Sequence, residues 1–317
     1  MKKVVSVSLG SSRRNHVARV EILGEEFEIS RTGTDGNMDK AISILKELDG
    51  KVDAIGLGGI DVYLYAGNTR YVLQDGLRLL ETVKKTPVVD GSGLKNTLER
   101  QAVEYMGAQG LVKQDTRVLM VSAMDRFGMA EAFAKIGCQL TLGDLMFSLG
   151  IRLPLYSLEK LHNIASKLMP VISRLPFRML YPTGQSQEKQ HRFNSKKYAK
   201  YYDEAEVVAG DYHFIRKYLP KKLKGQMILT NTTTREDVEE LMDRGASALI
   251  TTTPEFQGRT FGTNVMEAVF LVLLKKAWED VSAEDYSQLL RELNWQPKVI
   301  RFKKESAGDM QQVEKIG

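Results

Sequence analysis

The chain of 317 residues has few of the residues that build disulfide or metal frameworks. Its single cysteine, Cys138, excludes an internal disulfide and suits a reducing compartment. This cysteine opens an apolar run and has no base beside it in the sequence, so we interpret it as a small core residue. We find no zinc-ligand spacing and therefore predict no metal site.

Long apolar runs are also missing. The longest, Val265–Leu274, is interrupted by Glu267, and the apolar run near the amino terminus is too short for a signal peptide. These features predict a cytoplasmic protein without membrane contact.

The charge balance is mildly basic, with a formal net charge of +5 and a pI near 9.0. The lysines gather at 196–200 and 217–224, as on a solvated helix edge, and no aromatic-rich RNA-binding motif accompanies them. Nucleic acid is therefore not the expected partner, and a small-molecule substrate is.

The second half of the sequence alternates strands with helices. Strands are predicted at 118–122, 139–142, 177–181, 206–209, 227–231 and 248–252, and helices at 157–174, 195–202 and 235–244. Thr233, with Glu236 three residues later, predicts a capping box for the last of these helices. The alternation predicts an α/β fold with a doubly wound, Rossmann-like parallel sheet, which binds ligands at the carboxyl ends of its strands.

The first half is expected to form a smaller α/β domain. Its strands are predicted at 3–8, 17–22, 26–29, 52–57, 70–73 and 86–89, and its helices at 39–48, 77–84 and 94–106. We therefore predict three parts: a substrate domain (1–107), a nucleotide-binding domain (115–262) and carboxyl-terminal helices (263–317) that pack back across the domains. Asn264 is expected to cap the first of those helices.

The segment Arg117–Leu145 has the order of a dinucleotide-binding βαβ unit, with an acidic residue, Asp144, about 20 residues after the turn. Most glycines of the G-x-G-x-x-G pattern are replaced, by Ser122 and Met124 among others, and Gly128 is the glycine that remains.

We expect Ser122, Arg126 and Gly128 to contact the cofactor at this turn, with Arg126 attracting a phosphate. Asp144 would accept from both ribose hydroxyls, which favours NAD over NADP; a helix-capping role for Asp144 is the alternative. The threonine-rich strand ends at 230–234 and 251–253 add hydroxyl groups. We expect Thr232 and Thr252 near the nicotinamide end.

Three polar loops follow the apolar strands of the first domain. The loop after the first strand carries Ser11, Arg13, Arg14 and Asn15, which suit a carboxylate or phosphate. Asp61 ends a glycine-rich turn. Asp90, Ser92 and Lys95 surround another glycine turn, and Asp90 joins the predicted substrate-binding residues.

The stretch 227–246, MILTNTTTREDVEELMDRGA, resembles the strand–Asn–x–x–Thr–helix segment of shikimate and quinate dehydrogenases. The segments VDAIGLGGID and TTTPEFQGRTFGTNVMEA resemble bacterial proteins labelled quinate 5-dehydrogenase. The resemblance implies an NAD(P)-dependent oxidoreductase acting on a polar hydroxy acid. The lysine segment of that group, Asn-Val-Thr-x-Pro-x-Lys, has no counterpart here. Lys95 for proton transfer and Asp61 to position it are chemically suitable stand-ins.

Two other functions stay open. One is a Rossmann-like ligand-binding or regulatory protein without hydride transfer. The other is a transferase that uses a nucleotide or S-adenosylmethionine. Whether the chain is an enzyme is thus undecided, with a dehydrogenase favoured. The helix at 157–174 and the apolar carboxyl-terminal helix are both suited to support a homodimer.

Overall fold

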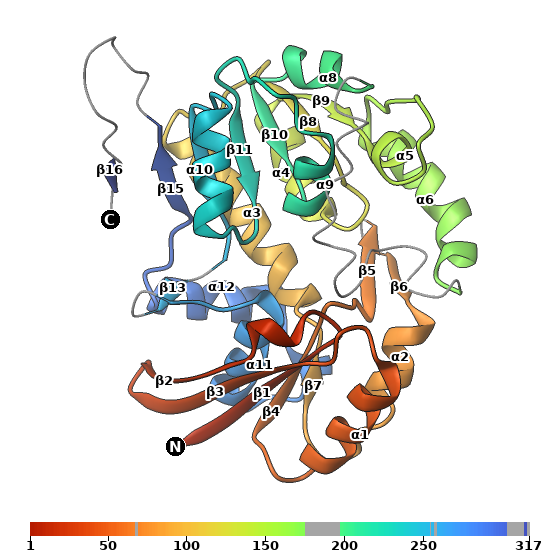
Figure 1. Cartoon of the computed structure of the whole chain (residues 1–317). Helices are drawn as coiled ribbons and strands as arrows, with labels where there is room; N and C mark the ends of the chain where they lie inside the picture. The colour runs from red at the N-terminus through yellow and green to blue at the C-terminus, as the bar shows by residue number, and fades with distance from the viewer. Residues whose placement is uncertain (67–68, 175–196, 254, 257–258, 303–313, 316–317) are drawn as a thin grey trace. The chain divides into compact units, whose positions relative to one another are not determined.

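The computed structural model describes residues 1–66, 69–174, 197–253, 255–256, 259–302 and 314–315 (Figure 1). The chain divides into two compact units, each α/β. Unit 1 comprises Met1–Thr97, Ser166–Lys189 and Pro254–Trp295, and unit 2 comprises Leu98–Ala165, Gln190–Thr253 and Gln296–Gly317. The prediction of an α/β protein is confirmed. The division itself differs from the predicted borders at 107, 115 and 262, because each unit is assembled from three separate stretches of chain.

Unit 1 contains a five-stranded sheet in the order β2-β3-β1-β4-β7. These strands are β1 (Lys2–Ser8), β2 (His16–Ile22), β3 (Glu25–Gly33), β4 (Ala54–Gly58) and β7 (Val88–Val89). β1 pairs in parallel with β3 and β4, β4 pairs in parallel with β7, and β2 is an antiparallel edge. The residues of β4 are nearly all buried, as expected for a central parallel strand covered on both faces.

Unit 1 also contains helices and a small hairpin. They are η1 (Ser12–Arg14), α1 (Met38–Leu48), α2 (Gln74–Leu80), α11 (Thr263–Leu274), η3 (Trp278–Asp280) and α12 (Ala283–Glu292), with β5 (Tyr63–Ala66) pairing β6 (Thr69–Val72) and β13 (Glu255–Phe256) pairing β14 (Arg259–Thr260). α11 lies against β4, and Gly56 makes this possible: a Cβ atom there would lie 2.6 Å from the Asn264 carbonyl oxygen. A segment far along the chain thus completes the core of the first unit.

Unit 2 contains a seven-stranded sheet in the order β16-β15-β12-β11-β10-β8-β9. Its strands are β8 (Arg117–Met120), β9 (Gln139–Leu142), β10 (Val207–Ala209), β11 (Met227–Thr230), β12 (Ala248–Thr251), β15 (Lys298–Arg301) and β16 (Glu314–Lys315). The five strands from β8 to β12 are parallel, and β15 and β16 continue the sheet in antiparallel pairing. The parallel strands therefore run 2-1-3-4-5, a doubly wound order that reverses between β8 and β10.

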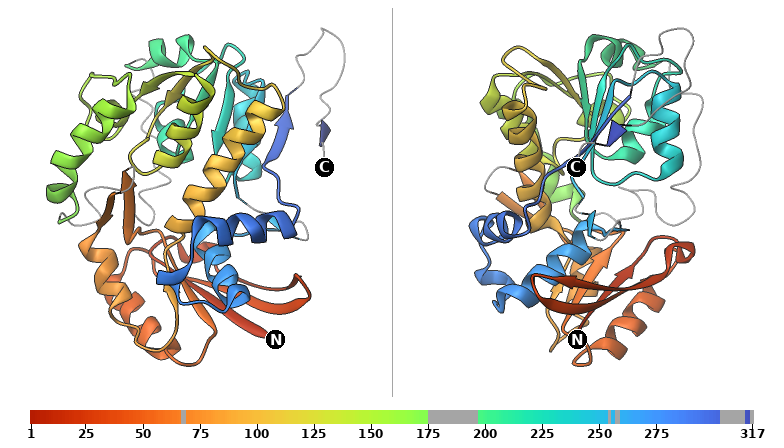
Figure 2. Two further views of the ribbon diagram at one scale, coloured as in Figure 1. Left: turned by 180° about the vertical axis from the view of Figure 1, so that it is seen from behind. Right: turned by 90° about the vertical axis from the view of Figure 1, so that its left-hand side faces the viewer.

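The helices of unit 2 are α4 (Phe127–Ile136), α5 (Asp144–Phe147), α8 (Ala199–Glu204), α9 (Tyr212–Tyr218) and α10 (Arg235–Asp243). α4 and α10 lie on opposite faces of the sheet (Figure 2). Two longer helices, α3 (Ser92–Ala108) and α6 (Leu158–Ile172), each belong to both units. The border between the units falls after Thr97 in α3 and after Ala165 in α6. No helix in the described part of the chain combines the length and hydrophobicity needed to cross a bilayer.

The predicted strands and helices of both halves are present where the structure describes the chain, apart from shifts at their ends. The strand predicted at 177–181 lies outside the described residues. Thr234 and Asp237, one residue beyond the predicted pair, form the capping box of α10. Gly262 stands at the N-cap of α11, whereas Asn264 donates its side-chain amide to Ser6 Oγ at 2.9 Å. The prediction that Asn264 caps this helix is therefore wrong, because its side chain is used by β1.

Candidate functional site

The reversal of strand order in unit 2 places two loops side by side at the carboxyl ends of β8 and β10. We name these loops, Val121–Arg126 and Gly210–His213, the β8–β10 rim. A Cβ atom on Gly210 would lie 2.7 Å from Val121 Cγ2, so the close approach of the two loops requires glycine there. Ser122 Oγ accepts from the Asp211 backbone amide at 3.4 Å. In doubly wound sheets this is the position at which ligands bind.

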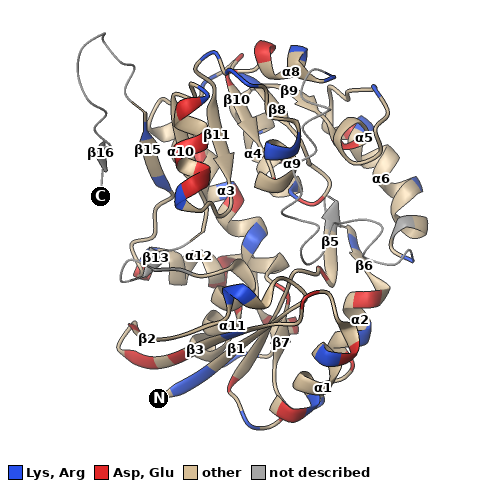
Figure 3. Ribbon diagram, in the orientation of Figure 1, with Lys and Arg blue, Asp and Glu red and all other residues tan. Residues whose placement is uncertain are grey.

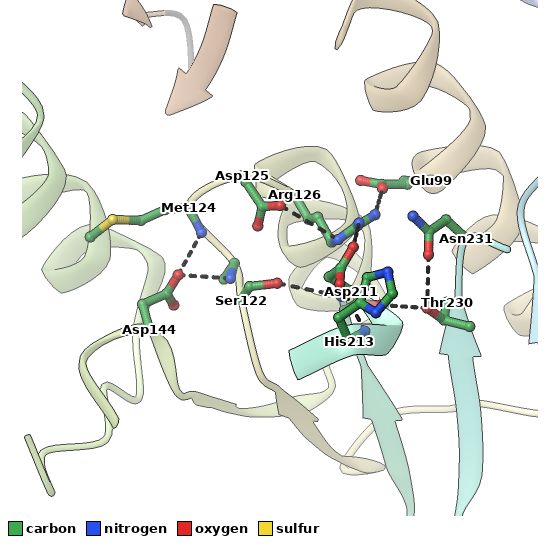
Figure 4. Close-up of polar contacts among 12 residues, drawn as sticks. Glu99, Ser122, Met124, Asp125, Arg126, Asp144, Asp211, His213, Thr230 and Asn231 are labelled. Atoms are coloured by element: carbon green, nitrogen blue, oxygen red, sulfur yellow. Dashed lines mark hydrogen bonds and ion pairs between the residues drawn. The ribbon is translucent and has the colours of Figure 1, made fainter. Parts of the chain in front are cut away.

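Arg126 is the centre of a buried ion network at this rim (Figure 4). Its guanidinium, 2% exposed, pairs with Glu99 of α3, with Asp211 at 3.2 Å and with Asp125 at 3.8 Å. One positive charge thus faces three carboxylates. The guanidinium is thus engaged by carboxylates of the chain itself, which leaves it less able to bind a ligand phosphate.

Asp144 follows β9 and reaches back to the turn after β8. Its Oδ1 atom accepts from the backbone amides of Ala123 and Met124, both at 2.8 Å. Burial raises the pKa of Asp144 to about 6, although these two hydrogen bonds oppose the rise. These amides are the donors that a pyrophosphate would require at the turn. The side chain predicted to bind ribose therefore occupies the anion-binding position of its own fold.

The other residues predicted at the cofactor turn are also enclosed. Ser122 is 4% exposed and holds the two rim loops together. Gly128 lies buried in the first turn of α4. His213, the last residue of the rim, is exposed, and its backbone amide donates to Asp211 Oδ1 at 2.9 Å (Figure 4).

The two threonine-rich strand ends do meet. The hydroxyl groups of Thr232, after β11, and Thr253, after β12, are 2.6 Å apart. Thr230 donates its hydroxyl to the Gly210 carbonyl at 2.8 Å, and Thr252 is 3% exposed. Thr232 is therefore at a cluster of hydroxyls next to the β8–β10 rim, whereas Thr252 belongs to the core of the sheet.

In unit 1 the loop after β1 is braced by its own polar side chains. Ser11 accepts from the Arg13 backbone amide at 3.3 Å, and Asn15 accepts from the Gly33 amide at 2.6 Å. Arg31, which the sequence reasoning missed, donates to the Ser11 carbonyl at 2.9 Å. Of the residues predicted to bind substrate in this loop, Arg13, Arg14 and Asn15 are exposed and Ser11 is buried.

Asp90 and Glu267 are two buried carboxylates at the start of α3. Asp90 accepts from the amides of Val62 at 2.7 Å, Tyr63 at 2.9 Å and Ser92 at 2.9 Å. The Asp90 carboxylate thus accepts hydrogen bonds from the backbone of the surrounding loops and holds them in place.

Glu267 of α11 is fully buried and accepts from the amides of Gly91 at 2.7 Å and Leu94 at 3.2 Å and from the Tyr286 hydroxyl at 2.7 Å. Burial, with Asp90 nearby, raises the pKa of Glu267 to about 7. This carboxylate caps the amino end of α3 and fills its anion-binding position. The one acidic residue inside an apolar run was the sequence signal for this role.

Lys95 and Asp61, the predicted catalytic pair, are both half-buried in unit 1. Lys95 lies in the first turn of α3, with its amide bonded to the Gly91 carbonyl at 2.9 Å. Asp61 follows β4, and its backbone packs closely against α2. A Cβ atom on Gly76 of α2 would lie 2.5 Å from the Asp61 carbonyl oxygen. Within the described residues, no group of three or more His, Cys, Asp and Glu side chains is arranged to hold a metal ion.

The chain belongs to the family described as domain of unknown function DUF8754, whose model matches residues 93–302. A second family model, domain of unknown function DUF8753, matches residues 3–90. The border between the two models coincides with the start of α3. No curated protein matches the chain.

Solved structures similar to the chain include three binding proteins. A galactofuranose-binding protein is 12% identical, with 92% of this chain and 98% of that chain covered and a TM-score of 0.39. The periplasmic binding protein of the arabinose ABC transporter from Shewanella sp. ANA-3, bound to arabinofuranose, is 9% identical (92% and 97% covered, TM-score 0.38). A fatty acid ABC transporter substrate-binding protein from Thermomonospora curvata is 12% identical (99% and 91% covered, TM-score 0.39). TM-scores this low do not assign a ligand.

These comparisons correct the predicted identity. The resemblance to quinate and shikimate dehydrogenases is wrong: the matching family models are two domains of unknown function, and no dehydrogenase family matches the chain. The predictions of an NAD(P)-dependent oxidoreductase and of a cytoplasmic protein are corrected with it, because no family model and no curated protein supports either. NAD or NADP as cofactor and the homodimer stay predictions.

Proposed function

We propose that this chain is a small-molecule-binding protein that does not transfer hydride. The observation that carries the proposal is the occupation of the turn after β8 by Asp144, which accepts from the amides of Ala123 and Met124. A dinucleotide needs those amides for its pyrophosphate and needs the carboxylate for its ribose. While the Asp144 carboxylate accepts from these two amides, neither the carboxylate nor the amides can bind a dinucleotide.

The charge at the β8–β10 rim supports a particular class of ligand. Asp211 presents a carboxylate at the rim that is 22% exposed. Carboxylates accept hydrogen bonds from hydroxyl and ammonium groups and repel anions. With the hydroxyls of Thr232 and Thr253 alongside, the rim favours a neutral or cationic ligand rich in hydroxyl groups.

A matched pair of small molecules tests this proposal. The cyclic polyol myo-inositol is neutral, whereas quinate carries similar ring hydroxyls plus a carboxylate. We expect thermal unfolding of the full chain to shift upward with neutral polyols and sugars such as myo-inositol, galactose and arabinose, and not with quinate, NADH, NADPH or S-adenosylmethionine. Tight binding of either reduced dinucleotide, seen as a change in its fluorescence, is the result that contradicts the proposal.

A rim variant links the ligand to the site. Asp211→Asn removes one rim charge from a side chain that is 22% exposed, and we expect it to weaken polyol binding. Asp203→Asn on α8, 39% exposed and paired with Lys224 instead, is the matched control and should leave binding unchanged.

A further inference from the structure

One short segment of unit 2 exposes an unusual amount of apolar surface. Leu149, Ile151 and Leu153 are 53%, 52% and 53% exposed, and Tyr156 is 64% exposed. These four are half of the large exposed apolar side chains in the described residues, and they lie within eight positions of each other. We name Leu149–Tyr156 the apolar segment; it joins α5 to α6 (Figure 1). A concentrated exposed apolar surface marks an interaction site.

The backbone of the apolar segment is anchored, so its side chains are held outward. Leu155 is buried and exchanges two backbone hydrogen bonds with Leu142 of β9, at 2.8 and 3.0 Å. The amides of Gly150 and Ile151 donate to the carbonyls of Met146 and Leu145 in α5, at 3.1 and 2.9 Å. The chain is thus fixed to the edge of the sheet on one side and presents aliphatic groups on the other.

Positive charge accompanies this apolar surface. Arg152 is exposed between Ile151 and Leu153, and Lys197 Nζ donates to the Gly150 carbonyl at 3.0 Å. From Leu145 to Leu158 the sequence contains no aspartate or glutamate. Elsewhere acidic and basic residues share the same helices, as on α1 and α10 (Figure 3).

We propose that the apolar segment docks on an anionic lipid surface. Aliphatic side chains and a tyrosine enter the boundary between headgroups and acyl chains, and an arginine among them extends its charge to the phosphates. Lys197 adds attraction to anionic headgroups. A second copy of this chain fits less well, because a symmetric contact through this segment would bring Arg152 and Lys197 against the same charges.

Vesicle sedimentation with the full chain tests the proposal. We expect sedimentation with vesicles of phosphatidylcholine plus phosphatidylserine, little with phosphatidylcholine alone, and loss at high salt. The combined variant Leu149→Ser, Ile151→Ser, Leu153→Ser should lose vesicle binding while keeping the thermal unfolding temperature. Arg152→Gln should weaken binding about fivefold.

Val17→Ser with Leu23→Ser is the matched control, since these side chains are 63% and 42% exposed on the hairpin of unit 1, and it should bind vesicles normally. The proposal is overturned if the unaltered chain does not sediment with anionic vesicles or sediments equally with neutral ones. It is also overturned if the triple serine variant still binds anionic vesicles. A concentration-dependent mass in light scattering that the triple variant abolishes would assign the segment to a second copy instead.

Discussion

The polar residues at and next to the β8–β10 rim form hydrogen bonds and ion pairs with one another, and these replace the contacts that a ligand phosphate would make. Asp144 takes two amides of the turn after β8, and Arg126 is enclosed by Glu99 and its neighbours. A carboxylate that belongs to the chain costs less entropy to hold at such a turn than a free anion does. The turn is therefore preorganised, with its anion position filled.

Removing that carboxylate should create an anion site. In Asp144→Ala the amides of Ala123 and Met124 lose their acceptor, which destabilises the protein by about 1–3 kcal/mol. Added phosphate or sulfate should then raise the unfolding temperature of this variant more than that of the unaltered protein.

Asp144→Asn is the matched control for this experiment, because its amide oxygen still accepts from both backbone groups. It should respond to phosphate as the unaltered protein does. Equal responses of the alanine variant and the unaltered chain would show that the turn does not bind anions when it is vacated.

At the scale of secondary-structure elements, α11 is linked to the start of α3 by the buried carboxylate of Glu267. Glu267 places a carboxylate on the amino end of a 17-residue helix, where the helix dipole favours negative charge. The same burial opposes that charge. The stability of this junction therefore depends on pH.

The pKa of Glu267 is about 7 in the folded protein, against 4.5 for the ordinary carboxyl group. Between these pH values the folded chain holds a proton that the unfolded chain has released. The free energy of unfolding should therefore fall as pH rises from about 5 to about 7, by at most about 3 kcal/mol from this group. Urea denaturation at several pH values measures this slope.

Glu267→Gln should flatten the slope in this window, since glutamine does not titrate. Exposed Glu279→Gln on η3 is the control and should leave the slope as it is. A slope that persists unchanged in Glu267→Gln would show that another group is responsible.

At the scale of the whole molecule, each unit is built from three stretches of chain. Unit 1 needs α11, which lies against β4 and supplies the cap of α3. Its folding therefore depends on contacts between residues that are far apart in sequence, such as Gly91 and Glu267, 176 positions apart.

A fragment of residues 1–107, the substrate domain that the sequence suggests, should accordingly not fold alone. It lacks α11, so the apolar residues of β4 would be exposed on one face. We expect circular dichroism with reduced helix content and no cooperative thermal transition. The full chain should give a cooperative one, and a cooperative transition of the fragment by itself would contradict this expectation.

The secondary structure was largely predictable because its determinants are local. β12 is a short, largely apolar run between turns, β9 alternates polar and apolar residues, and α1 and α10 show helical spacing. The capping box of α10 was placed one residue early, because neighbouring threonines offer the same local pattern. The positions of polar side chains were less predictable, since Glu99 and Arg126 pair across 27 residues.

The sequence by itself determined the alternation of strands and helices, the α/β class and the polar character of the strand ends, because these follow from side-chain polarity and period. Only the tertiary structure decided which of those polar groups are hydrogen-bonded or ion-paired inside the protein and which stay accessible. Asp144 and Arg126 look like ligand-binding residues in sequence, yet each is buried against a partner. The reason is physical: a buried charge must be paired or hydrogen-bonded, and the fold supplies the partner.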